Sequence, residues 1–406
     1  MALLPVTSAL EQILSGVGSP AEEMVSVFAA DGRVLTRDLV AMFTQPPFAA
    51  SAMDGYAVYG NGAAPVGARW TVIGESAAGR GFAGRVGPGE AVRIFTGAPV
   101  PADCATVVIQ EDVARDGDVI VATDATASGA NIRRAGNDFA QGDVLLKRGH
   151  RLDPHALTLA AAMGHGEVPV ARRPVVAILA TGDELVPPGA RPGPDQIVSS
   201  NPAGIAALVT RAGGVPLQLG IVADRMDELR AAIAQARGTQ ELARGADILI
   251  TIGGASVGDH DLVGPALKEE GIDLAFWKVA IRPGKPLMFG RLDATRVMGL
   301  PGNPVSALIT ARVFLVPLIH TLLGIEPGAR DLETAALTQP LEANGPRLHL
   351  MRAKLGRDAS GALTVTPMPS QDSSLLSALV EADCLIWREP EAALASAGDA
   401  VRFQRL

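Results

Sequence analysis

The stretch Val175-Val-Ala-Ile-Leu-Ala-Thr-Gly-Asp-Glu184 decides the fold class. Its first six residues are all apolar, which is typical of a strand buried on both faces of a parallel sheet. A turn with one glycine and two carboxylates follows directly. Two further strands are predicted to end in similar turns, since 248–252 leads into Gly253-Gly-Ala-Ser256 and 297–300 leads into Pro301-Gly-Asn-Pro304. The pattern predicts parallel strands with polar turns at their carboxyl ends.

Helical segments separate these strands. We expect helices over 202–212, 227–236, 262–270 and 304–323, and a further strand over 215–222. Strands and helices that alternate in this order form a doubly wound, mostly parallel sheet. We therefore predict an α/β domain at 173–328.

The rest of the chain has a different pattern. Residues 1–44 read as helical, whereas short β-type runs alternate with Gly, Pro and Asp turns after residue 50. The order indicates an α/β multidomain protein in which an antiparallel β module is inserted into a small helical domain. The predicted parts besides the α/β domain are a helical domain at 1–49 and 140–172, the β module at 50–139, and a C-terminal β domain at 329–406.

Composition limits the partners and the compartment. The 406 residues include 35 Lys+Arg and 43 Asp+Glu, and the net charge of −8 argues against a general binder of nucleic acid or anionic membranes. Cys104 and Cys384 show no metal-ligand spacing, so a reducing compartment fits. The N-terminus lacks the features of a signal peptide, and the longest apolar candidate, 313–323, contains Pro317 and His320. We expect no nucleic acid, no membrane and a cytoplasmic location.

The polar turns of the α/β domain suit a phosphorylated ligand. Because ligands of an open parallel sheet bind at the carboxyl ends of the strands, the turns are expected along one edge. Asn303-Pro304 and Asn201-Pro202 fit helix starts, where free N–H groups attract anions. Glu184, Asp259 and Asp261 could hold a Mg²⁺ ion that bridges to a phosphate. A well-capped connection between strand and helix is the alternative for each turn taken alone.

A basic segment lies close to these turns in the sequence. Lys278 and Arg282 are four residues apart and share one face if the segment is extended, and Lys285 follows. Such a basic pair suits an oxyanion or a phosphate, although an ordinary solvated edge strand is the alternative.

The expected β module carries its own polar cluster. Ser51-Ala-Met-Asp54-Gly55 is a short turn with one carboxylate, and Thr96 stands in a second turn. Arg133 and Asp138 belong to a third segment. Surface turns without a ligand are the alternative interpretation.

Two familiar nucleotide-binding motifs are excluded. Gly79-Arg-Gly-Phe-Ala-Gly84 has the dinucleotide-binding spacing, but Gly87-Pro-Gly89 follows and denies it the required helix. No G-x-x-x-x-G-K-[ST] loop occurs, and the six histidines show no ligand spacing. His260, the one histidine within a candidate site, reads as a bystander.

Six motifs together resemble the molybdopterin molybdotransferase family, to which the C-terminal region of gephyrin belongs. They follow the family's order and span nearly the whole chain. The motifs are Ser51-Ala-Met-Asp-Gly-Tyr56, Thr96-Gly-Ala-Pro99, Thr181-Gly-Asp-Glu-Leu185, Gly253-Gly-Ala-Ser-Val-Gly-Asp259, Arg282-Pro-Gly-Lys-Pro286 and Gly299-Leu-Pro-Gly-Asn-Pro-Val-Ser306.

The resemblance implies a transferase that inserts molybdenum from molybdate into adenylylated molybdopterin. It implies Mg²⁺-dependent release of AMP, as the final step of molybdenum cofactor synthesis, with a molybdopterin adenylyltransferase as the upstream partner. It also implies an elongated homodimer, with the site between the α/β domain of one subunit and the β module of the other.

The resemblance and the turns together give a set of expected site residues. Catalytic roles fall to Asp54, Glu184, Asp261, Lys278 and Arg282. Metal binding falls to Glu184, Asp259 and Asp261. Substrate binding falls to Thr96, Arg133, Asp138, Asp224, Ser256, Lys285, Pro301, Asn303, Pro304 and one serine of 373–377, taken as Ser377.

Some positions depart from the family pattern. Ala49-Ala50 replaces a usual polar pair, Arg282 replaces a common lysine, and 346–352 matches only loosely. Two alternatives remain, a molybdopterin adenylyltransferase-like enzyme and a non-catalytic pterin-binding scaffold. The Ser-Ala-Met-Asp-Gly module disfavours the first, and retention of the acidic residues disfavours the second.

Overall fold

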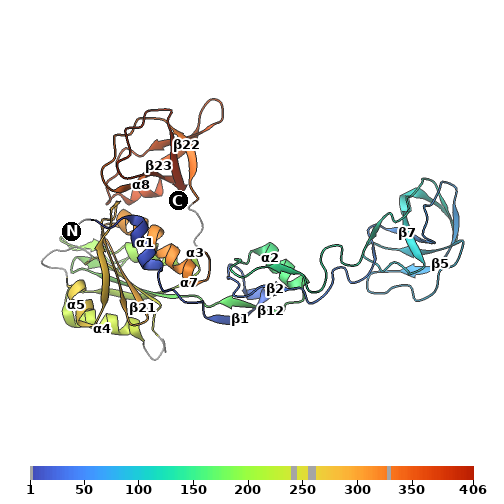
Figure 1. The fold of residues 1–406 in the computed structure, drawn as a ribbon, viewed down its shortest axis with the longest axis horizontal. Helices are drawn as coiled ribbons and strands as arrows, with labels where there is room; N and C mark the ends of the chain where they lie inside the picture. The colour runs from blue at the N-terminus through green and yellow to red at the C-terminus, as the bar shows by residue number, and fades with distance from the viewer. Residues whose placement is uncertain (1–2, 239–244, 255–261, 327–330) are drawn as a thin grey trace. The chain divides into compact units, whose positions relative to one another are not determined.

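The computed structural model describes residues 3–238, 245–254, 262–326 and 331–406. Contacts divide the chain into two units, Met1–Glu23 with Ala171–Leu406, and Met24–Val170. The first unit contains the predicted α/β sheet and the C-terminal β domain, and the second contains the β module (Figure 1). The finer division into four domains stays a prediction.

A six-stranded sheet forms the centre of the first unit, in the order β16-β13-β17-β21-β20-β18. The four parallel strands are β16 (Val215–Val222), β13 (Val175–Thr181), β17 (Ile248–Ile252) and β21 (Thr295–Leu300). Two antiparallel strands, β20 (Pro286–Leu292) and β18 (Asp273–Lys278), extend it at one edge. The predicted fold class is confirmed, and this antiparallel pair is an addition that the sequence pattern did not indicate.

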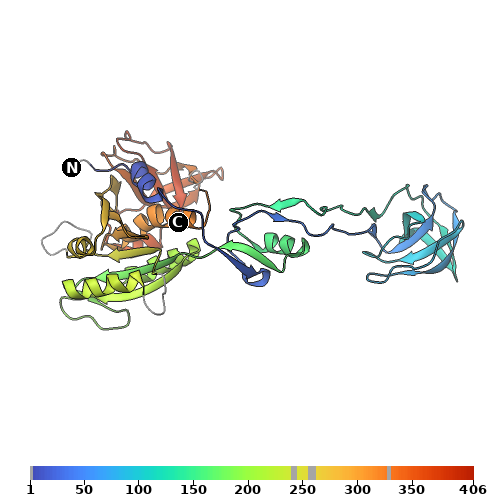
Figure 2. The same ribbon diagram turned by 60° about the horizontal axis from the view of Figure 1, so that its bottom comes forward.

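Helices cover both faces of this sheet (Figures 1 and 2). On one face, Leu229 and Ile233 pack against Ala177 and Leu179 of β13. The helices of that face are α4 (Met226–Arg237) and α5 (Val263–Glu269), and those of the other are α3 (Asn201–Ala212), α6 (Pro304–Thr310), α7 (Val316–Leu322) and α1 (Val6–Leu14). Residues 176–179 are fully buried, as their unbroken apolar sequence predicts.

The last helical run is continuous over Pro304–Leu322 but not uniformly α-helical. A π-helical turn, Ala311–Leu315, separates α6 from α7 and precedes Pro317, which has no N–H to donate. By length and composition, this run is the one helix in the described part of the chain that could span a membrane. However, 61% of it is buried inside the protein, as expected for a core helix.

The C-terminal β domain is barrel-like. Its sheet has the order β19-β23-β24-β22-β26-β25, and an additional β23–β25 pairing closes it. The strands are β19 (Ile281–Arg282), β22 (Glu333–Leu337), β23 (Leu348–Arg357), β24 (Leu363–Pro367), β25 (Cys384–Arg388) and β26 (Ala400–Arg405). Because β19 belongs to the expected α/β segment, the two parts of the first unit share backbone pairing through it.

The second unit contains a six-stranded sheet with the order β7-β4-β6-β5-β9-β8. All its pairings are antiparallel except β5–β6. The strands are β4 (Gly55–Tyr59), β5 (Arg69–Ser76), β6 (Glu90–Ile94), β7 (Cys104–Ile109), β8 (Val113–Asp116) and β9 (Val119–Ala122). A short pair, β3 (Ala50–Ser51) and β10 (Ile132–Arg133), lies where the chain enters and leaves the module.

The second unit also contains a small core that is built around one helix, α2 (Pro154–Ala162). Its strands are β1 (Glu22–Ser26), β12 (Glu167–Ala171), β2 (Leu39–Val40) and β11 (Val144–Leu146). The prediction of helix throughout 1–44 was wrong beyond α1. Gly16, with a φ of 59°, and Pro20 interrupt the helical pattern, and the apolar residues after them belong to strands and a short 3₁₀ turn, Val27–Ala29.

Candidate active site

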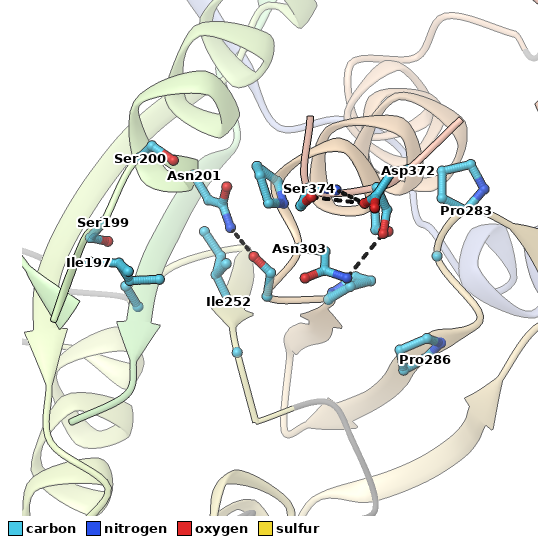
Figure 3. A pocket seen from close by; sticks show the side chains of 18 of the residues that line it. Ile197, Ser199, Ser200, Asn201, Ile252, Pro283, Pro286, Asn303, Asp372 and Ser374 are labelled. Carbon is cyan, nitrogen blue, oxygen red and sulfur yellow. Dashed lines mark hydrogen bonds between the residues drawn. The ribbon is translucent and has the colours of Figure 1, made fainter. Parts of the chain in front are cut away.

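A cavity of about 940 Å³ opens at the carboxyl ends of β13, β17 and β21 (Figure 3). Its walls come from the turns after these strands, from the start of α3, from 282–286 and from the C-terminal β domain. The polar and charged side chains of its lining are Thr181, Glu184, Ser199, Ser200, Asn201, Arg282, Lys285, Asn303, Ser306, Arg347, Gln371, Asp372, Ser373 and Ser374.

The three strand-end turns meet closely, as the sequence predicts. Gly253 has a φ of 93°, and a Cβ atom there would lie 2.6 Å from the carbonyl oxygen of Thr181. A Cβ atom on Gly302 would lie 3.9 Å from the Cα atom of Gly253. The backbones of these turns are therefore packed side by side, and only glycine fits at position 253 without strain.

The asparagines at the helix starts bridge segments instead of capping helices. Asn303 is the N-cap residue of α6, but its Nδ2 atom donates to Ser373 Oγ over 3.0 Å. Asn201 is already inside α3, and its Nδ2 atom donates to the carbonyl oxygen of Gly302 over 2.6 Å (Figure 3). The first free amide expected at α6, that of Val305, donates to the Ser373 carbonyl oxygen. Asn201 and Asn303, which the sequence predicts at helix starts, therefore connect the segments that line the cavity.

One turn of the C-terminal β domain, residues 371–374, reaches into the cavity. Arg352, which is 1% exposed, donates to the carbonyl oxygens of Ser370, Asp372 and Leu375 and so fixes this turn from behind. Hydrogen bonds from the Ser374 amide and hydroxyl keep the pKa of Asp372 below its usual value. Asp372 is therefore ionised, and its Oδ1 atom accepts both of these bonds.

Three cations line the cavity. Arg282, Lys285 and Arg347 form no ion pair with any described residue. The neighbouring His349 is 8% exposed, and its burial together with Arg282, Arg347 and Arg388 lowers its pKa to about 4. His349 is therefore neutral near pH 7, and the arginines and the lysine carry the positive charge that can attract an anion.

Glu184 is the predicted metal residue that the structure places at the cavity. Asp224 accepts a hydrogen bond from the Thr181 hydroxyl and does not line the cavity. Ser256, Asp259 and Asp261 lie outside the described residues. In the part of the chain that the structure describes, no group of three His, Cys, Asp or Glu residues could hold a metal ion.

The predicted basic stripe is divided between two sheets. Lys278 ends β18 and does not line the cavity, whereas Arg282 belongs to β19 of the C-terminal barrel. Val279 and Ala280, between them, are buried and hydrogen-bonded to neighbouring backbone, so one continuous strand does not form. The interpretation of a single extended face was therefore wrong, although Arg282 and Lys285 do reach the cavity.

Sequence reasoning missed Arg347 and Gln371-Asp372 as lining residues, and it selected Ser377 from the serine run. Ser377 lies in α8 (Leu376–Val380) and does not line the cavity, whereas Ser373 and Ser374 do. The loose match at 346–352 and the serine run were the available signals for this wall.

In the second unit, Asp54 and Thr96 are brought together. Asp54 Oδ1 accepts hydrogen bonds from the Thr96 amide over 2.8 Å and from its hydroxyl over 2.9 Å. These bonds, with a smaller contribution from Arg93, hold the pKa of Asp54 below its usual value. The second carboxylate oxygen makes no hydrogen bond within the described residues, so an ionised acceptor remains free.

Arg133 and Asp138 lie on the segment that runs back along residues 45–52. Arg133 stands opposite Ala50 in the β3–β10 pair, and the amide of Asp138 donates to the carbonyl oxygen of Gln45. Both side chains are exposed, and neither forms a hydrogen bond or ion pair with Asp54.

Known protein families match consecutive regions along nearly the whole chain. Residues 4–164 match the MoeA N-terminal region (domain I and II), 177–321 match a probable molybdopterin binding domain, and 334–406 match the MoeA C-terminal region (domain IV). The molybdopterin molybdenumtransferase of Haemophilus influenzae is 34% identical, over 99% of this chain and 98% of its own. That of Bacillus subtilis is 34% identical over 94% and 89%.

Solved structures agree with these matches. The molybdopterin biosynthesis MoeA protein of Pyrococcus horikosii has a TM-score of 0.83 and 29% identity, covering 100% of this chain and 99% of its own. The fold and these matches define a transferase of molybdenum cofactor biosynthesis. The chain belongs to the molybdopterin molybdenumtransferase family.

Proposed function

We propose that this chain inserts molybdenum from molybdate into adenylylated molybdopterin and releases AMP. The cavity of about 940 Å³, lined by three cations that form no ion pair with a described residue, is the observation that carries the proposal. A cavity of this size matches the upper range of small-molecule sites. Both the substrate, through its phosphates, and molybdate are oxyanions, which guanidinium and ammonium groups bind well.

In this proposal, Arg282, Lys285 and Arg347 bind oxyanion groups at one side of the cavity. Ser373 and Ser374 add hydroxyl groups beside them. The packed turns after β13, β17 and β21 give a surface on which the pterin or the nucleotide can lie without meeting large side chains. His349 is neutral and adds no charge, so the positive charge on this side of the cavity comes from the three cations.

Mg²⁺ is the proposed cofactor. Glu184 fits, because Mg²⁺ in nucleotide sites is often held by one or two carboxylates together with substrate phosphates. Asp259 and Asp261 are the further residues proposed to hold it. When bound, Mg²⁺ would neutralise phosphate charge. Asp54 is the proposed catalytic residue of the second unit, since one oxygen of its ionised carboxylate makes no hydrogen bond within the described residues and could contact the reacting groups.

The test is to incubate the protein with adenylylated molybdopterin, molybdate and Mg²⁺ and to measure AMP and cofactor formation. We expect both products, strongly reduced in Glu184→Gln and Asp261→Asn at near wild-type melting temperatures. Arg402→Gln, on the exposed side of the barrel, is the control and should keep full activity. Substrate binding without AMP would instead support a scaffold, and ATP consumption with pyrophosphate release would support an adenylyltransferase. Full activity in both acidic variants would reject the metal assignment.

We also propose a homodimer that receives its substrate from a molybdopterin adenylyltransferase. Large apolar side chains on the second unit support an interface, since Phe28 is 97% exposed and Phe43 is 61% exposed. Mixing inactive Asp54→Ala with inactive Glu184→Gln should restore about a quarter of the activity if two subunits share each site. A monomer at micromolar concentration in sedimentation would reject the dimer.

A cytoplasmic location is the last part of the proposal. Both cysteines are free and buried, and burial raises the pKa of each thiol to about 12. Two unpaired thiols of this kind are typical of proteins in a reducing compartment.

A further inference from the structure

Arg93 lies beside the Asp54 turn, between two aromatic rings. Antiparallel pairing of β4 with β6 sets Arg93 opposite Tyr56. The guanidinium carbon lies 4.9 Å from the ring centroid of Tyr56 and 4.9 Å from that of Phe95. Cation–π contacts with both rings hold the guanidinium group beside the turn.

Hydrogen bonds from Arg93 reach the backbone next to Asp54. Its Nη1 atom donates to the carbonyl oxygen of Gly55 over 3.1 Å, and its Nη2 atom donates to Gln110 Oε1 over 2.6 Å. The amide of Gln110 in turn donates to the carbonyl oxygen of Asp54 over 3.0 Å. The backbone carbonyl groups of Asp54 and Gly55 are therefore held by one connected network of hydrogen bonds.

The same arginine also connects to the turn that binds the Asp54 carboxylate. Phe95, one of its two rings, directly precedes Thr96, whose amide and hydroxyl donate to Asp54. The Gly55 backbone lies close against β7, because a Cβ atom added there would lie 2.0 Å from the carbonyl oxygen of Val108. The turn therefore rests against β7 on one side and against Arg93 on the other.

We propose that Arg93 is a positioning residue for Asp54, which fixes the direction in which the free carboxylate oxygen points. This inference rests on the proposed function, since Arg93 is proposed to act through Asp54 and not by contact with the substrate. The shape of the guanidinium group matters as much as its charge, because the group donates to two acceptors and also contacts two aromatic rings. A lysine keeps the charge but not this geometry.

Charged groups around the turn are few. Arg93 on β6 is the one charge that contributes to the lowered pKa of Asp54. Arg115 on β8 donates to the Tyr56 hydroxyl over 3.5 Å, and Glu111 accepts from the Gln110 side chain over 3.2 Å. Arg115 contacts the same tyrosine without reaching Gly55 or Gln110, which makes it a matched control.

The test is a double-mutant cycle on turnover with Arg93→Met and Asp54→Asn. Arg93→Met should lower kcat for AMP release about 10-fold to 100-fold, the scale of a misplaced catalytic group, with KM nearly unchanged. In the Asp54→Asn background the same change should have no further effect, because Arg93 acts through that carboxylate. Arg93→Lys should restore less than half of the lost activity, and Arg115→Met should be fully active.

The outcomes separate the two proposals. Normal turnover in Asp54→Asn rejects the role of Asp54 itself, whatever Arg93 does. Low turnover in Asp54→Asn with normal turnover in a folded Arg93→Met overturns the positioning role. Equal losses from Arg93→Met in both backgrounds also overturn it, since Arg93 would then act independently. Melting curves of Arg93→Met and Arg93→Lys identify any loss that comes from unfolding.

Discussion

The cavity of the first unit and the Asp54 turn of the second unit use charge in opposite ways. In the cavity, Arg282, Lys285 and Arg347 form no ion pair with the residues that the structure describes, so toward these residues their charge is not neutralised. In the turn, the charge of Asp54 is fixed by two hydrogen bonds from Thr96 and by Arg93 nearby. An open cationic surface favours binding, whereas a fixed carboxylate favours a defined chemical role. Under the proposed function, we therefore expect changes in the first region to affect affinity and changes in the second to affect turnover.

The largest expected effect is on turnover in Asp54→Asn. Asparagine can accept both Thr96 hydrogen bonds through Oδ1, so the turn persists while the charge is lost. We expect AMP release to fall about 100-fold or more with substrate affinity retained, as measured by single-turnover kinetics and titration. Asp54→Ala should lose stability as well, because the Thr96 donors then lack an acceptor. Near-normal turnover in Asp54→Asn would reduce Asp54 to a structural residue.

The second prediction concerns the neutral histidine among the cations. The pKa of His349 is about 4 in the folded state and near 6.5 in the unfolded chain. The unfolded state therefore binds the additional proton as pH falls below 6.5, and stability is lost on acidification. When the pH falls from 8 to 5, the unfolding free energy of wild type should decrease by about 2 kcal/mol more than that of His349→Gln, as measured by denaturant titration. His155→Gln, at a side chain that is 97% exposed, should behave like wild type. Identical pH profiles for all three proteins would show that His349 is not held neutral.

The third prediction tests the cationic surface by affinity. Arg282→Gln and Arg347→Gln should each weaken binding of AMP or molybdate about 10-fold in calorimetric titrations, because each removes a charge-assisted donor. Arg402→Gln changes the same residue type where Glu389 already pairs it, so its affinity should not change. If the three variants bind equally well, the anion site lies elsewhere.

The smallest expected effect compares two glycines. Gly253 and Gly189 have similar φ angles, 93° and 92°, but only Gly253 has a backbone oxygen close to an added Cβ. Gly253→Ala should therefore cost about 1 kcal/mol more unfolding free energy than Gly189→Ala, measured by denaturant titration. Equal losses would show that the strand-end turns can separate, and the packed floor of the cavity would then not be rigid.

Much of the first unit is predictable from the sequence because its signals are local. The strand at 175–181 and its glycine turn stand next to each other in the chain, and a parallel sheet brings such turns to one edge. β18 and β20 were missed because they form an antiparallel edge pair, for which the pattern of strand and helix gives no signal.

The composition of the site depends on contacts that no spacing reveals. Thr96 is 42 residues from the carboxylate that it binds, and Ser373 is 70 residues from Asn303. Arg347 and the 371–374 turn reach the cavity because the barrel pairs with β19, which is a tertiary event. The motifs could therefore identify candidate residues, but not the partners that set their charge and direction.

The bonds between α6 and the 371–374 turn have a kinetic consequence. Asn303 donates to the Ser373 hydroxyl, and the Val305 amide donates to the Ser373 carbonyl oxygen, so two parts of the chain close one wall of the cavity. A molecule that enters over the open rim can leave by the same path, so neither step requires these bonds to break. Exchange of a ligand is therefore not limited by their lifetime, and the wall can keep its shape through binding and release.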